Sequence, residues 1–356
     1  MKLLFLTEFF PRDKQLIFTG GVEARVYYIV KKAQKDFQVK VISSSSKKIP
    51  ATFLSVFTRI SYLIYSFFKA LKSDFDIVEA SNFVTYLPAF LIAKLKRKPV
   101  IAWIPDVLGK DWFQFGKFVG LPGIILEKIS LKLNWNHIIA LSHSTKDKLI
   151  KIGVNQNKIT VVHGGIEPSE FRIKKPEKFP QFTIICIARL VRTKQIKDLI
   201  TAFAKIDKAR LIIIGQGPLE NELKQLAEKL KLSKKINFQK NLTRRQLIHT
   251  LCRSHLFCLP STVEGFGLVT IEAMAAGLPA VITDIPIHQE ITHQGRGVLF
   301  FKSFDSDDLA KKILKLKNNP QLYQRKQQQG VKLARLYTWS KIYKQTKKVY
   351  EDCYSR

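Results

Sequence analysis

Residues 255 to 281 read HLFCLPSTVEGFGLVTIEAMAAGLPAV. An apolar run, His255 to Pro260, is followed by a loop that contains Gly265 and Gly267 and then by the segment Ile271 to Ala276. The apolar run predicts a buried strand, and the later segment predicts a helix that opens after the glycine-containing loop. The N-terminus of such a helix presents free backbone N–H groups and the positive end of its dipole. This stretch therefore predicts an anion site, suited to a diphosphate, within an α/β fold.

Short apolar runs alternate with longer amphipathic segments in both halves of the chain, which predicts strands and helices around parallel sheets. We expect each half to supply about six strands, enough for one doubly wound sheet. In the first half the expected strands are Leu3 to Thr7, Gln38 to Ser43, Ile77 to Ala80, Val100 to Trp103, His137 to Ser142 and Ile159 to His163. In the second half they are Thr183 to Ala188, Arg210 to Gly215, Ile236 to Gln239, His255 to Pro260, Ala280 to Thr283 and Gly297 to Phe300.

The 356 residues exceed what one hydrophobic core usually serves, so the length predicts two domains. The segment Pro168 to Gln181 combines three prolines with a group of basic residues, and we expect the interdomain linker there. The amphipathic tail predicts a closing helix. The predicted domains are residues 1–170 and 171–335, followed by a C-terminal helix within 336–356 that packs back on the N-terminal domain.

Charge is the unusual bulk property, because 60 basic and 28 acidic residues give a net charge of +32 that is spread over both halves. Such a surface attracts polyanions, either an anionic membrane leaflet or nucleic acid, and charge alone does not distinguish them. The four cysteines have neither metal-ligand spacing nor a disulfide framework, which fits a reducing compartment. The first residues, MKLLFLTEFF, predict a buried strand and are too short for the apolar core of a signal peptide. A cytoplasmic location follows as the expectation.

Two carboxylates, Glu264 and Glu272, flank the glycine-containing loop with seven residues between them. One could hold a ribose and the other a transferred sugar, because a carboxylate accepts two hydroxyl hydrogen bonds. They could also be a solvated loop residue and an acid favoured by the helix dipole. The whole stretch resembles the E-x7-E motif of glycosyltransferase family 4, with matches at Glu264, Gly265, Phe266, Gly267, Leu268, Glu272, Ala273, Gly277 and Pro279. The resemblance implies that Glu264 contacts the donor sugar and Glu272 the ribose.

Other segments resemble the same family over nearly the whole chain. Residues 187 to 195, IARLVRTKQ, resemble its donor-phosphate segment, which implies that Arg189 and Lys194 neutralise the departing diphosphate. Gln195 stands where the family usually has glycine, so the loop geometry is open at this point. Gly215 resembles a turn that approaches the base or phosphate, and Gly20 and Gly21 resemble the loop that closes over the donor. Without the resemblance, these would be surface charges and flexible turns.

The resemblance implies the GT-B fold, in which two Rossmann-like domains face a central cleft. It also implies retaining transfer of a hexosyl unit from a UDP- or GDP-sugar to a lipid-linked or glycan acceptor. The chain has no DxD motif in a suitable loop, so we expect neither a metal nor another cofactor. After the strand Val100 to Trp103 the family commonly has a His and an acid, but this chain has Pro105 and Asp106. Asp106 is a candidate for contacting the sugar or accepting a proton; a simple turn residue is the alternative.

Residues Phe53 to Lys72 are strongly apolar but contain Arg59, Lys69 and Lys72, which predicts an interfacial helix or a core helix, not a membrane span. Lys94 to Lys98, with the aromatic residues Trp112, Phe113, Phe115 and Phe118 that follow, add a basic and aromatic surface near the expected acceptor cleft. We expect the segments Phe53 to Lys72 and Lys94 to Lys98 to hold the protein on the anionic cytoplasmic leaflet. Two other classes compete with a membrane-peripheral transferase. One is a GT-B relative of the phosphorylase or epimerase type, and the other is a nucleic-acid-binding protein, which no recognised motif supports.

Overall fold

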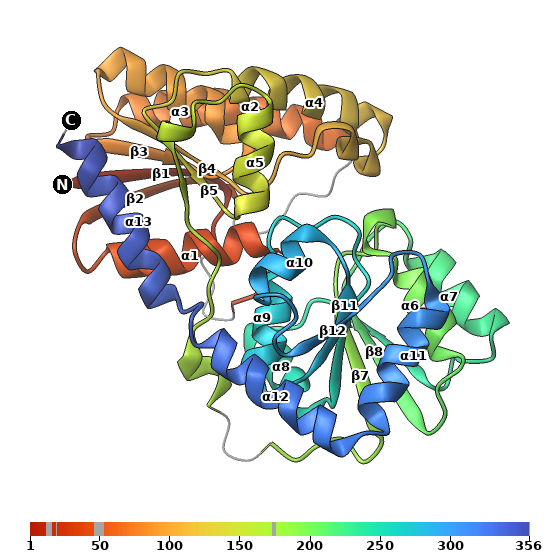
Figure 1. Ribbon diagram of the computed structural model, residues 1–356. Coiled ribbons are helices and arrows are strands. Elements are labelled where there is room, and N and C mark those ends of the chain that lie inside the picture. The colour runs from red at the N-terminus through yellow and green to blue at the C-terminus, as the bar shows by residue number, and fades with distance from the viewer. Residues whose placement is uncertain (12–15, 19, 46–52, 173–175, 356) are drawn as a thin grey trace. The chain divides into compact units, whose positions relative to one another are not determined.

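The computed structural model of the 356-residue chain describes all residues except 12–15, 19, 46–52, 173–175 and 356. It contains two compact units, each built around one parallel sheet (Figure 1). Unit 1 consists of Met1–Gly164 and Trp339–Arg356, and unit 2 consists of Gly165–Thr338. The units divide slightly before the expected boundary at residues 170 and 171. Residues 173–175 of the predicted linker lie outside the described residues.

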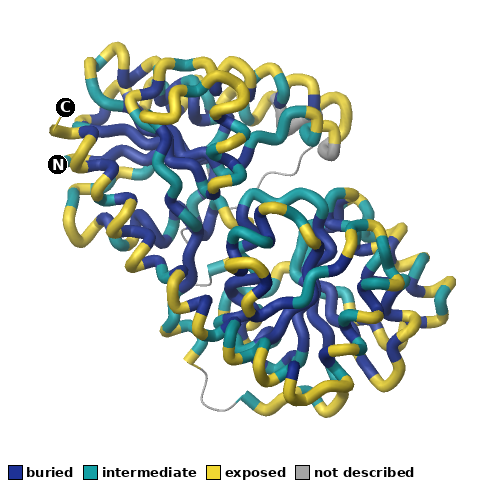
Figure 2. The backbone as a smooth tube through the Cα atoms, viewed as in Figure 1, coloured by how far each residue is buried: buried dark blue, intermediate teal, exposed yellow. Residues whose placement is uncertain are grey.

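The sheet of unit 1 has six parallel strands in the order β2-β1-β3-β4-β5-β6. Its central strands are buried along their length (Figure 2), as expected for a parallel sheet with helices on both faces. The strands are β1 (Lys2–Phe9), β2 (Gln38–Ser45), β3 (Ile77–Ala80), β4 (Val100–Ile104), β5 (His137–Ala140) and β6 (Ile159–Val161). The helices are α1 (Gly21–Ala33), α2 (Phe53–Leu71), α3 (Phe83–Lys96), α4 (Lys117–Leu131), α5 (His143–Lys151) and α13 (Trp339–Tyr354), with short 3₁₀ turns η1 (Gly109–Phe115) and η2 (Gln156–Lys158).

Strand β3 shows how alternation divides the two faces of this sheet. Val78 and Ala80 pack into the core beneath α2, α3 and α4, which lie together on one face (Figure 1). Glu79 points to the other face, where its carboxylate pairs with the guanidinium of Arg25 from α1 and accepts a hydrogen bond from the Tyr350 hydroxyl at 2.6 Å. Because Tyr350 lies on α13, this buried network attaches the C-terminal helix to unit 1.

The sheet of unit 2 also has six parallel strands, in the order β12-β11-β10-β7-β8-β9. The strands are β7 (Phe182–Ile187), β8 (Ala209–Ile214), β9 (Ile236–Gln239), β10 (Leu256–Leu259), β11 (Ala280–Thr283) and β12 (Val298–Phe301). The helices are α6 (Ile196–Phe203), α7 (Glu220–Lys229), α8 (Arg244–Arg253), α9 (Leu268–Ala275), α10 (Pro286–Ile291), α11 (Ser306–Lys317) and α12 (Pro320–Ala334), with 3₁₀ turns η3 (Pro168–Phe171) and η4 (Arg192–Lys194). The predicted α/β architecture with two doubly wound sheets is confirmed.

Candidate functional site

The loop between β10 and α9 lies at the carboxyl edge of the unit 2 sheet, where ligands of open α/β sheets bind. Gly267, the N-cap residue of α9, has φ 76° and ψ 44°, a left-handed conformation that glycine adopts without steric cost. Phe266 is buried and packs edge-on against Tyr337, with ring centroids 5.7 Å apart. Gly265 and Leu268 are partly exposed. The core therefore holds the loop from behind, while its backbone leads into the first turn of α9.

Two cations from the segment after β7 accompany Glu264. The Lys194 ammonium lies 2.7 Å from Oε1 of Glu264 and donates to the carbonyl oxygen of Val263 at 3.0 Å. Burial favours the protonated form of Glu264, but the ion pair with Lys194 outweighs it and holds the pKa of Glu264 below its ordinary value. Burial lowers the pKa of Arg189, and attraction to Glu264 opposes this shift. Two cations and one carboxylate leave a net positive charge, which favours an anion.

Glu272, in α9, belongs to a buried network with Arg244, the first residue of α8. Nη1 of Arg244 lies 2.5 Å from Oε1 of Glu272, and Nε lies 2.9 Å from Oε2 of Glu170. Burial raises the pKa of Glu272 although Arg244 opposes this effect. Sequence reasoning missed Arg244. The capping box of Thr243 and Gln246 indicates where α8 starts, but no sequence signal shows that the next side chain reaches Glu272.

His288, in α10, is a second residue that sequence reasoning missed. Its side chain is fully buried, and Nδ1 lies 2.8 Å from the carbonyl oxygen of Thr283. A carbonyl only accepts hydrogen bonds, so Nδ1 carries the proton and Nε2 is an acceptor in the neutral ring. Burial lowers the pKa of His288, which keeps the ring neutral. Nε2 has no hydrogen-bond partner in the part of the chain that the structure describes, and a Cβ at Gly267 would lie 3.7 Å from it. An unused acceptor therefore borders the glycine-containing loop.

The structure explains why position 215 is glycine and shows which backbone conformation Gln195 adopts. A Cβ at Gly215 would come within 1.8 Å of the carbonyl oxygen of Ala188, so close packing of two protein segments requires glycine there. The sequence analysis had assigned this requirement to a ligand. Gln195 has φ 46° and ψ 38°, the left-handed conformation that glycine would adopt easily. The glutamine therefore keeps the backbone geometry of the loop at a steric cost of about 1–2 kcal/mol.

In unit 1, Asp106 follows β4 and is buried. Its Oδ1 accepts a hydrogen bond from the backbone N–H of Val107 at 2.8 Å and lies 2.7 Å from Nζ of Lys148. Burial raises the pKa of Asp106, and Lys148 opposes that shift. Oδ2 is buried without a hydrogen-bond partner among the described residues. One carboxylate oxygen is thus held by the protein and the other remains available.

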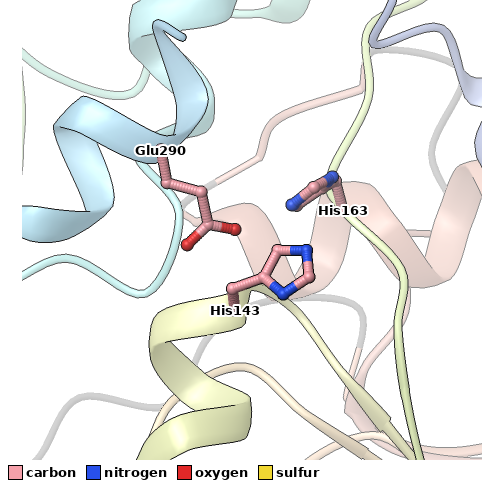
Figure 3. A group of neighbouring side chains, drawn as sticks. All are labelled: His143, His163 and Glu290. Carbon is pink, nitrogen blue, oxygen red and sulfur yellow. The ribbon is translucent and has the colours of Figure 1, made fainter. Parts of the chain in front are cut away.

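Two glycines and two histidines also lie at this edge of the unit 1 sheet. Gly20 is the N-cap residue of α1 and Gly21 its first residue, and a Cβ on either would meet no atom of the described residues within 4 Å. His143 opens α5 and His163 follows β6, with ring centroids 6.0 Å apart (Figure 3). Glu290, also drawn in Figure 3, lies on α10 and belongs to unit 2. The unit therefore offers a glycine turn, a carboxylate and two imidazoles after successive strands.

Two family models match consecutive parts of the chain. The one described as Glycosyltransferase Family 4 matches residues 19–170, and the one described as Glycosyl transferases group 1 matches residues 168–333. The chain belongs to glycosyltransferase family 4. The family predicted from the E-x7-E stretch is thereby confirmed, and the two matches together include every predicted site residue of this family 4 chain.

The curated relatives of this family 4 chain include two proteins whose names contain a lipid. It is 26% identical over 226 residues to the phosphatidylinositol N-acetylglucosaminyltransferase gpi3 subunit of Schizosaccharomyces pombe, which covers 61% of this chain and 49% of that protein. It is 28% identical over 202 residues to alpha-monoglucosyldiacylglycerol synthase of Acholeplasma laidlawii, covering 54% and 50%. An uncharacterized glycosyltransferase of Methanocaldococcus jannaschii is 25% identical over 376 residues, covering 99% and 98%. The chain spans about half the length of the first curated relatives it matches.

Solved structures show the fold of this family 4 chain. Anabaena HepE, crystallised in complex with UDP and glucose, superposes with a TM-score of 0.78 at 19% identity, over 99% of this chain and 100% of that one. Sucrose-phosphate synthase from Thermosynechococcus elongatus gives a TM-score of 0.80 at 16% identity, over 99% of both chains. At these identities the likeness concerns the fold alone, and that fold is GT-B.

The predicted catalytic and donor-binding residues of this family 4 chain fall into two sets. Unit 2 brings Arg189 and Lys194 to Glu264 beside the loop that opens α9, whereas Glu272 lies in the separate network with Arg244. Unit 1 contains Gly20, Gly21 and Asp106 at the ends of its own elements. Each of these residues thus has a defined environment within its own unit.

Proposed function

We propose that this family 4 protein transfers a hexosyl unit from a nucleotide diphosphate sugar, a UDP- or GDP-sugar, to a lipid-linked or glycan acceptor at the cytoplasmic face of a membrane. The observation that supports this most is the group of Arg189, Lys194 and Glu264 beside the N-terminus of α9. A net positive group at a helix N-terminus suits a diphosphate, and a carboxylate beside it suits sugar hydroxyls.

In this proposal the protein stabilises the leaving group more than it supplies a nucleophile. Arg189, Lys194 and the first turn of α9 neutralise the charge that develops on the departing diphosphate. The configuration of the sugar is retained because the acceptor hydroxyl attacks from the face that the diphosphate leaves, and a phosphate oxygen takes the acceptor proton. Glu264 holds the sugar and Glu272 the ribose, which requires Glu272 to share its carboxylate between Arg244 and the ligand. No metal takes part, since protein cations neutralise the charge.

On the acceptor side we assign Asp106 to the sugar or to the acceptor hydroxyl, through the oxygen that has no partner among the described residues. A lipid-linked acceptor is in keeping with the names of two relatives, a phosphatidylinositol N-acetylglucosaminyltransferase subunit and an alpha-monoglucosyldiacylglycerol synthase. Gly20 and Gly21 leave open space in unit 1 that suits approach of a ligand.

A thermal-shift panel of nucleotide diphosphate sugars tests the donor assignment. A ligand at a hundred times its Kd adds about 2.7 kcal/mol, which raises the Tm of a domain of this size by about 5–10 °C. We expect one nucleotide to give this shift in the wild-type protein and a smaller shift in Lys194→Met. If no sugar nucleotide moves the Tm of the wild-type protein, the proposed function is wrong.

A further inference from the structure

The outer face of α2 exposes large apolar side chains. They recur every three or four residues and are each at least about half exposed: Phe57, Ile60, Ile64, Tyr65 and Phe68. This is the period of one helix face. The side chains of residues 53–56 lie outside the described part of the chain. The described turns of α2 therefore have an exposed apolar face, which the interfacial alternative for this segment requires.

Helix α4 repeats the pattern, of which the sequence predicted only the aromatic Phe118. Phe118, Leu121, Ile125 and Ile129 follow one face, and Phe118 is 76% exposed. The opposite face is tightly held, because Glu127 accepts hydrogen bonds from the backbone N–H groups of Leu108 and Gly109 at 2.8 and 2.7 Å. The exposed side chains thus project from a helix that is fixed to the core.

These faces form one layer. Helix α3 packs against both α2 and α4 on the same side of the sheet (Figure 1), and it adds exposed Leu91 and Leu95. Within its described residues, unit 2 exposes large apolar side chains only at Phe304 and Leu336. Contiguous apolar patches of this kind are rare on monomeric soluble domains and mark interaction surfaces. The outer face of α2, α3 and α4, called here the outer helical face, is therefore an interaction surface.

The exposed charges on the three helices of the outer helical face are all basic. Helix α2 contains no acidic residue, and the only acid in the sequence of α4 is the buried Glu127. Exposed lysines accompany the apolar side chains on these helices and just beyond their ends: Lys69, Lys72, Lys117, Lys128 and Lys132. A face with apolar side chains and lysines matches the headgroup region of an anionic bilayer.

Some of the cations predicted for this surface have protein partners instead. Arg59 lies 2.7 Å from Glu8, Lys98 lies 3.5 Å from Asp76, and Lys96 donates to the carbonyl oxygen of Ser73 at 2.6 Å. These contacts use the charges within unit 1. The basic groups of the outer helical face are therefore the lysines of α2 and α4 together with the exposed Lys94 and Arg97 at the end of α3. Of the Lys94 to Lys98 segment, Lys96 and Lys98 contribute less than the sequence suggested.

We propose that the outer helical face inserts into an anionic lipid bilayer, with α4 as a second inserting helix beside α2. This inference rests on the proposed membrane-bound acceptor and names the surface that brings the protein to it. No helix among the described residues is both long and apolar enough to cross a bilayer. A second copy of the chain fits less well, since a two-fold contact would place the same lysines of both copies against each other.

The test compares three variants by flotation with vesicles of phosphatidylcholine alone or mixed with phosphatidylglycerol. The first changes Phe118, Leu121, Ile125 and Ile129 to Gln, and the second changes Lys117, Lys128 and Lys132 to Gln. The matched control changes Phe304 and Leu336 to Gln, which removes exposed apolar side chains from unit 2. All are exposed positions, where substitution has little effect on stability.

We expect the wild-type protein and the control to float with the mixed vesicles. The apolar variant should bind the mixed vesicles at least about a hundredfold more weakly, because four exposed apolar side chains lose their contact with lipid. The lysine variant should bind the mixed vesicles about a hundredfold more weakly, and its preference for vesicles with phosphatidylglycerol should be smaller than that of wild type. Flotation of the apolar variant equal to wild type would overturn the inference, as would equal wild-type binding to both vesicles.

Light scattering and the donor panel separate the remaining outcomes. If the wild-type protein does not float but forms a dimer that the apolar variant abolishes, the outer helical face binds a second copy and the inference is wrong. If flotation behaves as expected while no sugar nucleotide shifts the Tm, the surface stands and the proposed function fails. The donor-induced shift of the apolar variant should equal that of wild type.

Discussion

Replacing Arg244 with methionine removes the cation between two carboxylates of unit 2. The guanidinium lies 2.5 Å from Glu272 and 2.9 Å from Glu170, and the side chains of Arg244 and Glu272 are 10% and 5% exposed. Methionine fills much of the same volume without charge, so Glu272 stays buried without a counter-ion. Breaking a buried ion pair in this way costs about 3–5 kcal/mol. Because Glu272 can take up a proton instead, we expect a loss of about 3 kcal/mol at pH 7.

Tryptophan fluorescence and circular dichroism separate the two units in a urea titration. The four tryptophans, Trp103, Trp112, Trp135 and Trp339, all lie in unit 1, whereas both units contribute to the dichroism. We expect the dichroism transition of Arg244→Met to begin at lower urea while the fluorescence midpoint stays unchanged. In the double variant with Glu272→Gln, about 2 kcal/mol should return, because the unpaired carboxylate is gone.

The loss should also depend on pH. The pKa of Glu272 is raised in the folded protein by burial, and without Arg244 it rises further. A carboxyl group whose pKa is higher in the folded than in the unfolded state adds stability at low pH, and this is lost as pH rises through the folded pKa. The deficit of Arg244→Met should therefore be larger at pH 8 than at pH 5. A stability within about 0.5 kcal/mol of wild type at pH 8, which is the usual scatter of surface substitutions, would refute the reasoning. A deficit that grows as the pH falls would also refute it.

Three further outcomes are expected. Gln195→Gly relieves a left-handed glutamine and should stabilise unit 2 by about 0.5–1 kcal/mol in the same titration, so a less stable variant would count against the strain. His288→Phe removes the unused acceptor beside Gly267 and should weaken binding of the sugar nucleotide about tenfold in calorimetry. The nucleoside diphosphate should bind as before, and equal losses of affinity for both ligands would exclude a contact between His288 and the sugar. Transfer should continue at an unchanged rate in EDTA, and loss of activity that manganese restores would show that a metal is required.

Much of the fold could be predicted because its signals are local. Buried parallel strands are short apolar runs, and the twelve expected strands all occur in the structure with small shifts at their ends. The loop before α9 was predictable for the same reason, since its glycines and carboxylates lie within one short stretch. The apolar stretch Phe53 to Lys72 also predicted a helix, either interfacial or in the core, and α2 lies there.

The missed features depend on contacts between distant segments. Arg244 reaches Glu272 and Glu170 from another helix, and the orphan nitrogen of His288 is defined by burial that one sequence does not reveal. The reason for Gly215 is the carbonyl of Ala188, which lies on a neighbouring strand connection. Helix α4 was overlooked because Gly120, Pro122 and Gly123 interrupt its apolar pattern; the two glycines face the core and allow close packing, including contact of Gly123 with Trp112.

The steady-state kinetics of sugar transfer in Glu264→Ala and Glu272→Ala test the central claim most directly. The donor found in the thermal-shift panel serves as substrate, and Glu170→Ala, which removes the other partner of Arg244, serves as the control. If Glu272 holds the ribose and Glu264 a sugar that gains charge in the transition state, Glu272→Ala should mainly raise the KM for the donor, and Glu264→Ala should mainly lower kcat. The control should keep the wild-type KM. Wild-type kcat and KM in both glutamate variants would contradict the account.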